Sequence, residues 1–265
     1  MELNDKSNNK VILIGVALIA MVFIFTFFRS ELFKKNSENE IEQKILNYPK
    51  ITSEDFKNKL KSSEDLKILD IRSSDDYAME HLANSINAVS EESINAISKE
   101  KTIIIVGYST EDEEYTKIID YLKKNKYYNF FILKGGFDAW KNIGGGTISI
   151  GNPNSFVDNS KINYIAPEDL KAIVENKNYP KYIIDMRPKQ SFDDGHIFGA
   201  ENIFLDELEK SADKIPFSKE IYIYGDTEFQ GFQAGVRLYD LGFMLVKVLK
   251  GGLTSWKDKG FEIVK

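Results

Sequence analysis

The sequence has no cysteine among its 265 residues, and this absence removes several kinds of chemistry. Disulfides, thiolate metal sites, cysteine nucleophiles and lipid anchors attached to cysteine are all excluded. Histidine is scarce too, with two in the chain. A zinc site would have to combine both histidines with carboxylates, so we expect no bound metal ion and no other cofactor.

Positive charge is in short supply, because 35 lysines and arginines stand against 41 aspartates and glutamates. The formal net charge is −6, and the sequence has no long basic run. Domains that bind nucleic acid carry clustered positive charge, so we expect no nucleic-acid partner. The length of the chain indicates one or two domains.

One stretch near the N-terminus lacks charge altogether: residues 11–28 read VILIGVALIAMVFIFTFF. As a helix it would be about 27 Å long, close to the thickness of the hydrocarbon core of a bilayer. A cleaved signal peptide is the alternative, but its apolar run would be shorter and followed by small residues, whereas Arg29 comes next. We therefore expect a tail at 1–10 and a single transmembrane helix at 11–28 that makes the membrane a partner.

The side of the membrane is less well marked by charge. Lys6 and Lys10 precede the apolar run, and Arg29, Lys34 and Lys35 follow it. This slight excess favours a cytoplasmic position for the C-terminal part. An N-terminal anchor with a short tail, however, usually exports the domains behind it. We expect a single-pass protein of the cell membrane with its soluble part outside the cytoplasm.

The rest of the chain repeats itself. His81 and His196 are 115 residues apart, and Trp140 and Trp256 are 116 apart. Rare residues at one offset indicate a duplicated domain. Three pairs of segments align at nearly the same offset: ITSEDF with IAPEDL, ILDIRSSDDYAMEHLANSIN with IIDMRPKQSFDDGHIFGAEN, and FILKGGFDAW with KVLKGGLTSW.

Each repeat alternates short apolar runs with an amphipathic run. The pattern predicts strands at 67–71, 102–108, 129–133, 182–186, 221–225 and 246–249, and helices at 113–125 and 232–242. Strand–helix alternation with continuous apolar strands is typical of an α/β fold, in which helices cover a parallel sheet. We expect a spacer at 29–49, a first domain at 50–146, a linker at 147–162 and a second domain at 163–265.

The repeats resemble the rhodanese family of sulfurtransferases, and the resemblance runs from about residue 50 to the end. The second repeat shows the family pattern at Asp185, Arg187, Phe192, Gly195-His196-Ile197, Gly199-Ala200, Asn202, Leu249-Lys250-Gly251-Gly252 and Trp256. The first shows it at Asp70, Arg72, Tyr77, His81, Asn87, Leu133-Lys134-Gly135-Gly136 and Trp140, and departs from it at Glu80, Asn84 and Ser85. The resemblance implies two rhodanese-like domains.

Several of these residues have an ordinary structural use. The aspartate and arginine at the strand end are expected to pair with each other or with backbone groups. The histidines are expected to fix a turn through ring hydrogen bonds rather than to transfer protons. The tryptophans are expected to pack on the sheet from the last helix.

Active members of the family use a cysteine at a strand end, where loop N–H groups and the helix dipole stabilise the thiolate. Counting back equal distances from the paired glycines puts this position at Gly225 in the second repeat and at Ser109 in the first. Neither residue can hold a persulfide. Ser109 could attack a substrate only with an adjacent base, because a serine hydroxyl is a weak nucleophile.

The loops that follow these positions are acidic. Candidate binding-loop residues are Ser109, Thr110, Glu111, Gly225, Asp226, Thr227, Glu228, Phe229 and Gln230. Carboxylates there repel an anionic substrate, with several kcal/mol at ~4 Å and an effective dielectric near 20. They suit the first turn of a helix instead, each contributing about 0.3–1 kcal/mol. A cation site or a contact with a basic partner at Glu111–Glu114 is the alternative.

These observations lead to three hypotheses about function. The first is a membrane-anchored tandem rhodanese-like protein without sulfurtransferase activity that acts as a binding or scaffold module for an unknown protein or small molecule. The second is an enzyme with non-cysteine chemistry at Ser109, or a substrate-binding role in sulfur metabolism. The third is ligand or peptide binding by the second repeat, whose loop carries Phe229.

Overall fold

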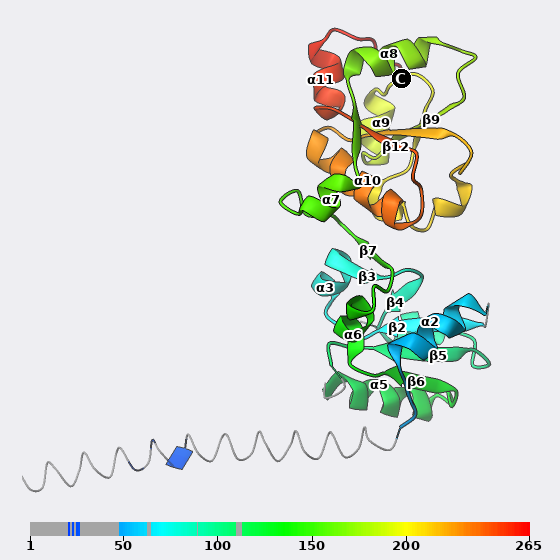
Figure 1. Cartoon of the computed structure of the whole chain (residues 1–265), viewed down its shortest axis with the longest axis vertical. Coiled ribbons are helices and arrows are strands. Elements are labelled where there is room, and N and C mark those ends of the chain that lie inside the picture. Colours follow the sequence, from blue (N-terminus) through cyan, green and yellow to red (C-terminus); the bar gives the residue numbers. More distant parts are fainter. Residues whose placement is uncertain are drawn as a thin grey trace, which may run out of the picture. The chain divides into compact units, whose positions relative to one another are not determined.

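The structure is a computed structural model, and it describes residues 21, 23, 25, 26, 48–62, 65–88, 90–109 and 113–265 (Figure 1). The expected tail at 1–10, most of the expected anchor at 11–28 and nearly all of the spacer at 29–49 lie outside the described residues. Within the described part of the chain, no helix is long and apolar enough to cross a bilayer.

The first repeat contains a five-stranded sheet with the strand order β1-β6-β5-β2-β4. Its strands are β1 (Lys50–Ile51), β2 (Leu66–Asp70), β4 (Ser85–Asn87), β5 (Thr102–Val106) and β6 (Phe130–Leu133). The described pairings of β1 with β6, β5 with β6 and β2 with β4 are parallel. Residues 103–106 of β5 are completely buried, which explains why this strand reads as an unbroken apolar run.

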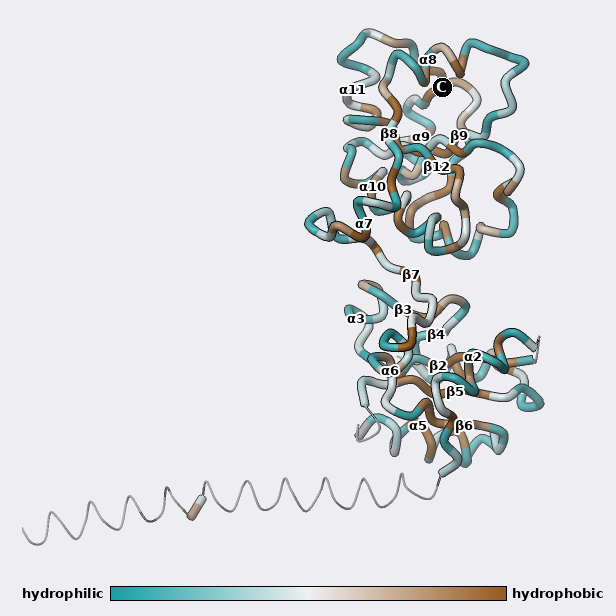
Figure 2. Tube along the Cα trace, viewed as in Figure 1, coloured by the Kyte–Doolittle hydropathy of each residue, from teal (hydrophilic) through white to brown (hydrophobic). Residues whose placement is uncertain are grey.

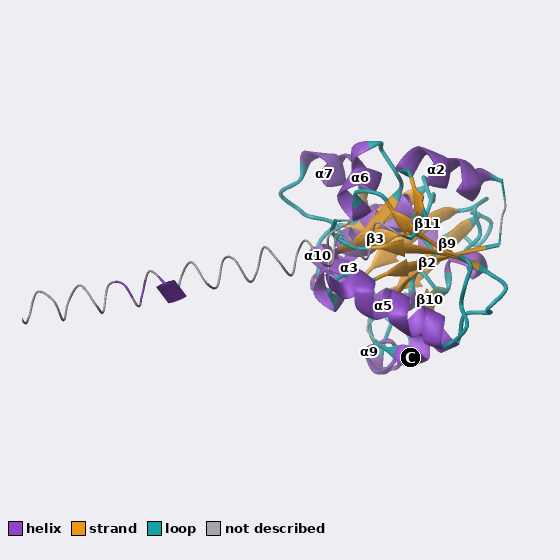
Figure 3. Cartoon of the chain, turned by 90° about the horizontal axis from the view of Figure 1, so that it is seen from below, coloured by secondary structure: helices purple, strands orange, loops and turns teal. Residues whose placement is uncertain are grey.

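Helices cover this sheet on both faces. They are α2 (Ser53–Lys61), α3 (Ser74–Met79), α4 (Glu91–Asn95), α5 (Glu113–Lys124) and α6 (Gly136–Asn142). The predicted helix at 113–125 is confirmed as α5, which buries Tyr115, Ile119 and Leu122. Helices α2 and α5 lie on opposite sides of the strands (Figure 3). Figure 2 shows the apolar character of β5 and β6 in brown.

The second repeat contains an equivalent sheet with the order β10-β9-β11-β12-β8. Its strands are β8 (Asn163–Ile165), β9 (Lys181–Asp185), β10 (Ala200–Asn202), β11 (Glu220–Tyr224) and β12 (Val246–Leu249), and all four pairings are parallel. The helices are α8 (Pro167–Glu175), α9 (Lys189–Asp194), α10 (Glu228–Asp240) and α11 (Gly252–Asp258). Two short 3₁₀ turns, η1 (Leu205–Glu207) and η2 (Ala212–Lys214), precede β11.

The alternation of side chains along the strands of the second sheet divides its core in two. One cluster, with Ile184 and Ile223, includes apolar residues of α10. The other, with Ile183 and Tyr224, includes apolar residues of α8 and α11, Trp256 among them. Successive strand residues point to opposite faces, so β9, β11 and β12 each supply both clusters. The two parallel sheets with helices confirm the predicted α/β fold of the two repeats.

The segment that connects the two repeats contains a strand and a helix. Within the predicted linker at 147–162, β7 (Thr147–Ser149) pairs antiparallel with β3 (Glu80–Leu82), and α7 (Phe156–Ser160) follows. Helix α10 also begins four residues earlier than the predicted helix at 232–242, since Thr227 provides an N-cap that apolar spacing does not reveal.

Candidate functional site

The candidate site of the second repeat lies where β9 and β11 end side by side. Tyr224, the last residue of β11, is the register partner of Asp185, the last residue of β9. Gly225 follows, and α10 begins at Glu228. The carboxyl ends of parallel strands are where open α/β sheets place their ligands, so the segment 225–230 occupies the expected position for a site.

A buried ion pair fixes the end of β9. Asp185 is completely buried, and Arg187 is 4% exposed. Arg187 donates from its backbone N and from Nε to Asp185 Oδ1 at 3.0 and 2.9 Å, and from NH2 to Asp185 Oδ2 at 2.7 Å. NH2 also donates to the carbonyl of Gly195 at 2.7 Å. Burial opposes the charge, but the hydrogen bonds that Arg187 donates to the Asp185 carboxylate outweigh it and hold the pKa of Arg187 above its usual value.

The first repeat reproduces this arrangement. Arg72 donates to Asp70 from its backbone N, Nε and NH2, and its NH2 reaches the carbonyl of Glu80 at 2.7 Å. The predicted pairing of the aspartate and arginine with each other and with backbone groups is confirmed in both repeats. Asn87 and Asn202 complete the turns by donating to carbonyls of these same pairs.

The two histidines fix turns, as predicted. His196 Nδ1 lies 3.0 Å from the carbonyl of Phe192, and the two rings stack with centroids 3.7 Å apart. His81 Nδ1 lies 2.7 Å from the carbonyl of Tyr77, and those rings stack at 4.1 Å. A ring that stacks over one residue and bonds its carbonyl is held in place, which is a structural task.

Gly225 is surrounded by the side chain of Gln230. A Cβ atom placed on Gly225 would lie 2.6 Å from Gln230 Cβ and 2.7 Å from Gln230 Oε1. That amide oxygen accepts hydrogen bonds from the backbone N–H groups of Asp226 at 2.8 Å and Thr227 at 3.2 Å. Two N–H groups that could hold an anion are therefore already bonded to the protein, and the space for a nucleophile's side chain is filled.

The remaining contacts hold the segment 225–230 against α11. The Glu228 carboxylate accepts from the N–H of Gly251 at 2.8 Å, and the carbonyl of Gly225 accepts from Leu253 at 2.9 Å. Thr227 and Gln230 form a reciprocal capping box at the start of α10. Thr227 and Gln230 thus cap α10, whereas the carboxylate of Glu228, in the first turn, binds the turn before α11, and that of Asp226 lies 3.5 Å from Arg187.

In the first repeat the residue equivalent to Gly225 is Gly107. The carbonyl of Gly107 accepts from the N–H of Phe137 at 2.8 Å, just as Gly225 accepts from Leu253. The predicted position, Ser109, lies two residues further along, because the chain from Gly107 to Gly135 is two residues longer than the chain from Gly225 to Gly251, and an equal count overshoots. Here Tyr115 fills the space, with its hydroxyl 2.7 Å from the Gly107 nitrogen and its ring 2.9 Å from a Cβ placed there.

A family model described as "Rhodanese-like domain" matches residues 52–143 and again residues 166–259. The chain belongs to the rhodanese family. It carries two rhodanese-like domains in tandem, neither of which has a cysteine.

Individual relatives match one domain at a time. The "Uncharacterized protein YqhL" of Bacillus subtilis (strain 168) is 34% identical over 94 residues, which are 34% of this chain and 75% of that protein. The "Adenylyltransferase and sulfurtransferase UBA4" of Candida albicans is 28% identical over 102 residues, which are 36% of this chain and 23% of that protein. The chain therefore spans about a quarter of the length of this second relative.

Two solved structures are also similar to this chain, one over a single domain and one over most of its length. A rhodanese-like domain from Anabaena sp. is 32% identical, with a TM-score of 0.36, and covers 38% of this chain and 77% of its own. The thiosulfate sulfurtransferase from Pseudomonas aeruginosa is 17% identical, with a TM-score of 0.44, and covers 82% of this chain and 43% of its own.

The predicted loop residues are placed as follows. In the second rhodanese-like domain Gly225, Asp226, Thr227, Glu228 and Gln230 come together at the start of α10, while Phe229 turns outward and is 50% exposed. In the first, Ser109 is exposed, and Thr110 and Glu111 lie outside the described residues. Among the residues that the structure describes, no group of histidines and carboxylates could hold a metal ion.

Three residues that matter here, Gly107, Tyr115 and Tyr224, were not among the predicted ones. Gly107 and Tyr115 were missed because counting back from the paired glycines assumes loops of equal length. The capping role of Gln230 was open to detection, since a threonine followed three residues later by a glutamine before an apolar run is a capping-box spacing. The hydroxyl of Tyr224, which accepts from the N–H of Ile197 at 3.0 Å, had no sequence signal.

Proposed function

We propose that this chain is a membrane-anchored tandem rhodanese-like protein that performs no sulfur transfer and acts as a binding or scaffold module. The observation that carries the proposal is the filled nucleophile position. In both domains a glycine stands there, and a side chain from the following helix, Tyr115 or Gln230, occupies the adjoining space.

The chemistry of sulfur transfer explains why a missing nucleophile excludes this activity. A sulfane sulfur is carried on a thiolate, which attacks the donor and becomes a persulfide, and the chain has no thiol. Water and serine hydroxyls are not substitutes, because an oxygen cannot hold the transferred sulfur as a persulfide. The acidic side chains of Asp226 and Glu228 add repulsion toward thiosulfate.

The membrane part of the proposal rests on residues 11–28, whose 18 uncharged residues match the length of a spanning helix. An anchored pair of non-catalytic domains would hold a ligand or protein close to the bilayer. Protease digestion of intact and opened membrane vesicles tests this. If the domains resist protease in intact vesicles that keep the orientation of the cell, they lie on the cytoplasmic side, which would contradict the extracytoplasmic position. Release of the protein from the membrane by alkaline carbonate would contradict the anchor.

The activity test uses the purified full chain with cyanide and either thiosulfate or 3-mercaptopyruvate. We expect no thiocyanate above the rate without protein. An active rhodanese added to the same mixture controls for inhibitors in the preparation. Turnover that scales with the concentration of this protein would refute the proposal.

A variant of Ser109 tests the alternative hypothesis that the chain is an enzyme with serine as its nucleophile. We expect Ser109→Ala and the wild-type chain to behave identically in this assay and in assays with ester substrates. Activity in the wild type that disappears in Ser109→Ala would instead identify serine as a nucleophile.

A second candidate function is ligand or peptide binding at the segment 225–231 of the second domain, which the half-exposed ring of Phe229 favours. Hydrogen exchange in the presence of proteins captured from membranes tests it. Added protection at 225–231 supports this site, and protection confined to other segments rejects it.

A further inference from the structure

The second rhodanese-like domain has a cavity away from the segment 225–230. Its volume is about 630 Å³, and none of its lining residues belongs to that segment. It is lined by Val174, Phe198, Trp256, Phe261, Lys177 and Glu262, together with the paired Lys171 and Glu175. Small-molecule sites commonly have volumes of about 300–1,000 Å³, mostly apolar walls and a few polar groups. The cavity lies within this range of volumes, and its walls combine four apolar side chains with two lysines and two glutamates.

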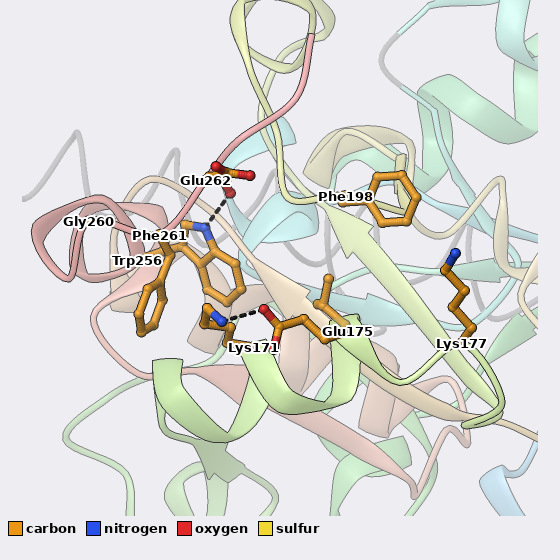
Figure 4. A pocket seen from close by; sticks show the side chains of 9 residues that line it. Lys171, Glu175, Lys177, Phe198, Trp256, Gly260, Phe261 and Glu262 are labelled. Atoms are coloured by element: carbon orange, nitrogen blue, oxygen red, sulfur yellow. Dashed lines mark hydrogen bonds and ion pairs between the residues drawn. The ribbon is translucent and has the colours of Figure 1, made fainter.

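The apolar wall has two parts. Trp256 and Phe261 contact each other edge to face with centroids 5.1 Å apart, and the indole N–H donates to the carbonyl of Glu262 at 2.9 Å. This part is built into the domain. Phe198 is different, because its side chain is 61% exposed. Figure 4 shows Phe198 and Lys177 on one side of the cavity and Trp256 with Phe261 on the other.

The two repeats differ at this cavity. At the repeat offsets that align the histidines and the tryptophans, Ala83 takes the place of Phe198, and Gly146 takes the place of Glu262. The first domain forms the same sheet order with these smaller residues. The fold therefore does not require an aromatic ring at 198 or a carboxylate at 262, and an exposed phenyl ring stands at the second domain's cavity without a structural need.

The charges around the cavity select among ligands. Lys171 is paired with Glu175 across one turn of α8 (Figure 4). Lys177 has no ion pair or hydrogen bond among the described residues, and it lies on the same side as Phe198. A carboxylate at that end would be complementary to Lys177. Glu262 stands on the other side and would repel a second anionic group.

We propose that this cavity binds a small aromatic monocarboxylate, with its ring between Phe198 and the Trp256 wall and its carboxylate at Lys177. The inference rests on the second domain alone and does not depend on whether sulfur transfer is absent. A failure of ligand binding would leave the thiocyanate result unchanged, and the two outcomes can be told apart.

Calorimetric titration of the full chain tests the inference with 3-phenylpropionate as the probe and 3-phenylpropan-1-ol as its uncharged counterpart. An exposed ion pair contributes about 0.2–1 kcal/mol, so we expect the carboxylate to bind up to about fivefold more tightly than the alcohol. Lys177→Gln should abolish this preference. Phe198→Ala should weaken both ligands, and it should fold normally because the side chain is exposed.

Lys210→Gln is the matched control, since Lys210 is an exposed lysine of the same domain that does not line the cavity. It should bind both compounds as the wild type does. Three results would overturn the inference: no binding of 3-phenylpropionate at millimolar concentration, a preference for the carboxylate that survives in Lys177→Gln, or equal binding by Phe198→Ala and the wild type.

Discussion

At the scale of single residues, the absence of a nucleophile and the filling of its pocket are two separate features of this chain. Gly225 leaves no side chain to react, and Gln230 fills the vacated space and bonds the loop N–H groups. Restoring a thiol alone would therefore not restore a rhodanese site, because the new side chain would meet Gln230.

A double-mutant cycle measures this conflict. Gly225→Cys should destabilise the second domain by about 1–3 kcal/mol through overpacking. Gln230→Gly removes all three atoms nearest to the new Cβ, although glycine in a helix costs about 1 kcal/mol in itself. We expect Gly225→Cys to lower the free energy of unfolding by at least about 1 kcal/mol less in the Gln230→Gly protein than in the wild type. Urea unfolding followed by Trp256 fluorescence, in a Trp140→Phe background, reports on this domain. Strictly additive effects would contradict the predicted contact.

Glu220 is a second residue with a measurable effect. Its carboxylate accepts from Tyr179 and Tyr222 and pairs with Lys247 at 3.0 Å, and these groups, in that order, lower the pKa of Glu220 to about 2. A carboxyl whose pKa is lowered by folding stabilises the protein above its unfolded pKa of about 4.3. That contribution is lost as the pH falls from there through about 2.

We expect Glu220→Gln to be less stable than the wild type at pH 6, and the difference to shrink by pH 3. The side chain is 29% exposed, so water screens the charge, and we expect a contribution below about 1 kcal/mol. The same fluorescence-detected unfolding, repeated between pH 3 and pH 6, measures it. Glu207→Gln, at an exposed carboxylate of η1, is the control. A gap that stays constant with pH would show that the carboxylate charge is not responsible.

At the scale of elements, the paired glycines after the last strand of each domain decide how closely the last helix approaches the nucleophile loop. A Cβ atom on Gly252 would lie 2.7 Å from the carbonyl oxygen of Asp226, and Gly252 has a φ of +64°. A Cβ atom on Gly136 would lie even closer to backbone, 2.4 Å from the carbonyl oxygen of Gly107. The paired glycines therefore allow a close packing contact between backbones, which any side chain would block.

Gly252→Ala should cost about 2–5 kcal/mol, because left-handed strain of about 1–2 kcal/mol adds to overpacking of about 1–3 kcal/mol. Gly242→Ala is the matched control. Gly242 also has a positive φ, of +96°, but an added Cβ would have no atom within 4 Å, so only the strain should appear. Thermal unfolding compares the two. Equal losses would mean that the contact with the Asp226 carbonyl has no energetic weight.

The elements also show what the sequence could predict. The strands β5, β9, β11 and β12 are short, mostly apolar runs of four or five residues, and all were predicted to within about two residues. The strands β1, β4, β8 and β10 were missed, because two or three residues carry no periodicity. Ser109 was assigned wrongly to the nucleophile position, since equal counting assumes loops of equal length, and only the hydrogen bond from Phe137 identifies Gly107.

At the scale of the whole molecule, the family pattern was legible twice in the sequence, and both sheets follow it. The sequence bears on activity only through the absence of a cysteine nucleophile. The structure adds a second reason that composition cannot give: each candidate anion site is already occupied by a tyrosine or glutamine of the same domain.

The central claim is that the N–H groups of Asp226 and Thr227, which could hold an anion, are already bonded to Gln230. Nuclear magnetic resonance of the ¹⁵N-labelled full chain tests it directly, by titration with thiosulfate while the amide signals of Asp226 and Thr227 are observed. Both amides are bonded to Gln230, so we predict that their shifts stay as constant as that of the remote Gly242. Saturable shifts confined to Asp226 and Thr227 would contradict the account.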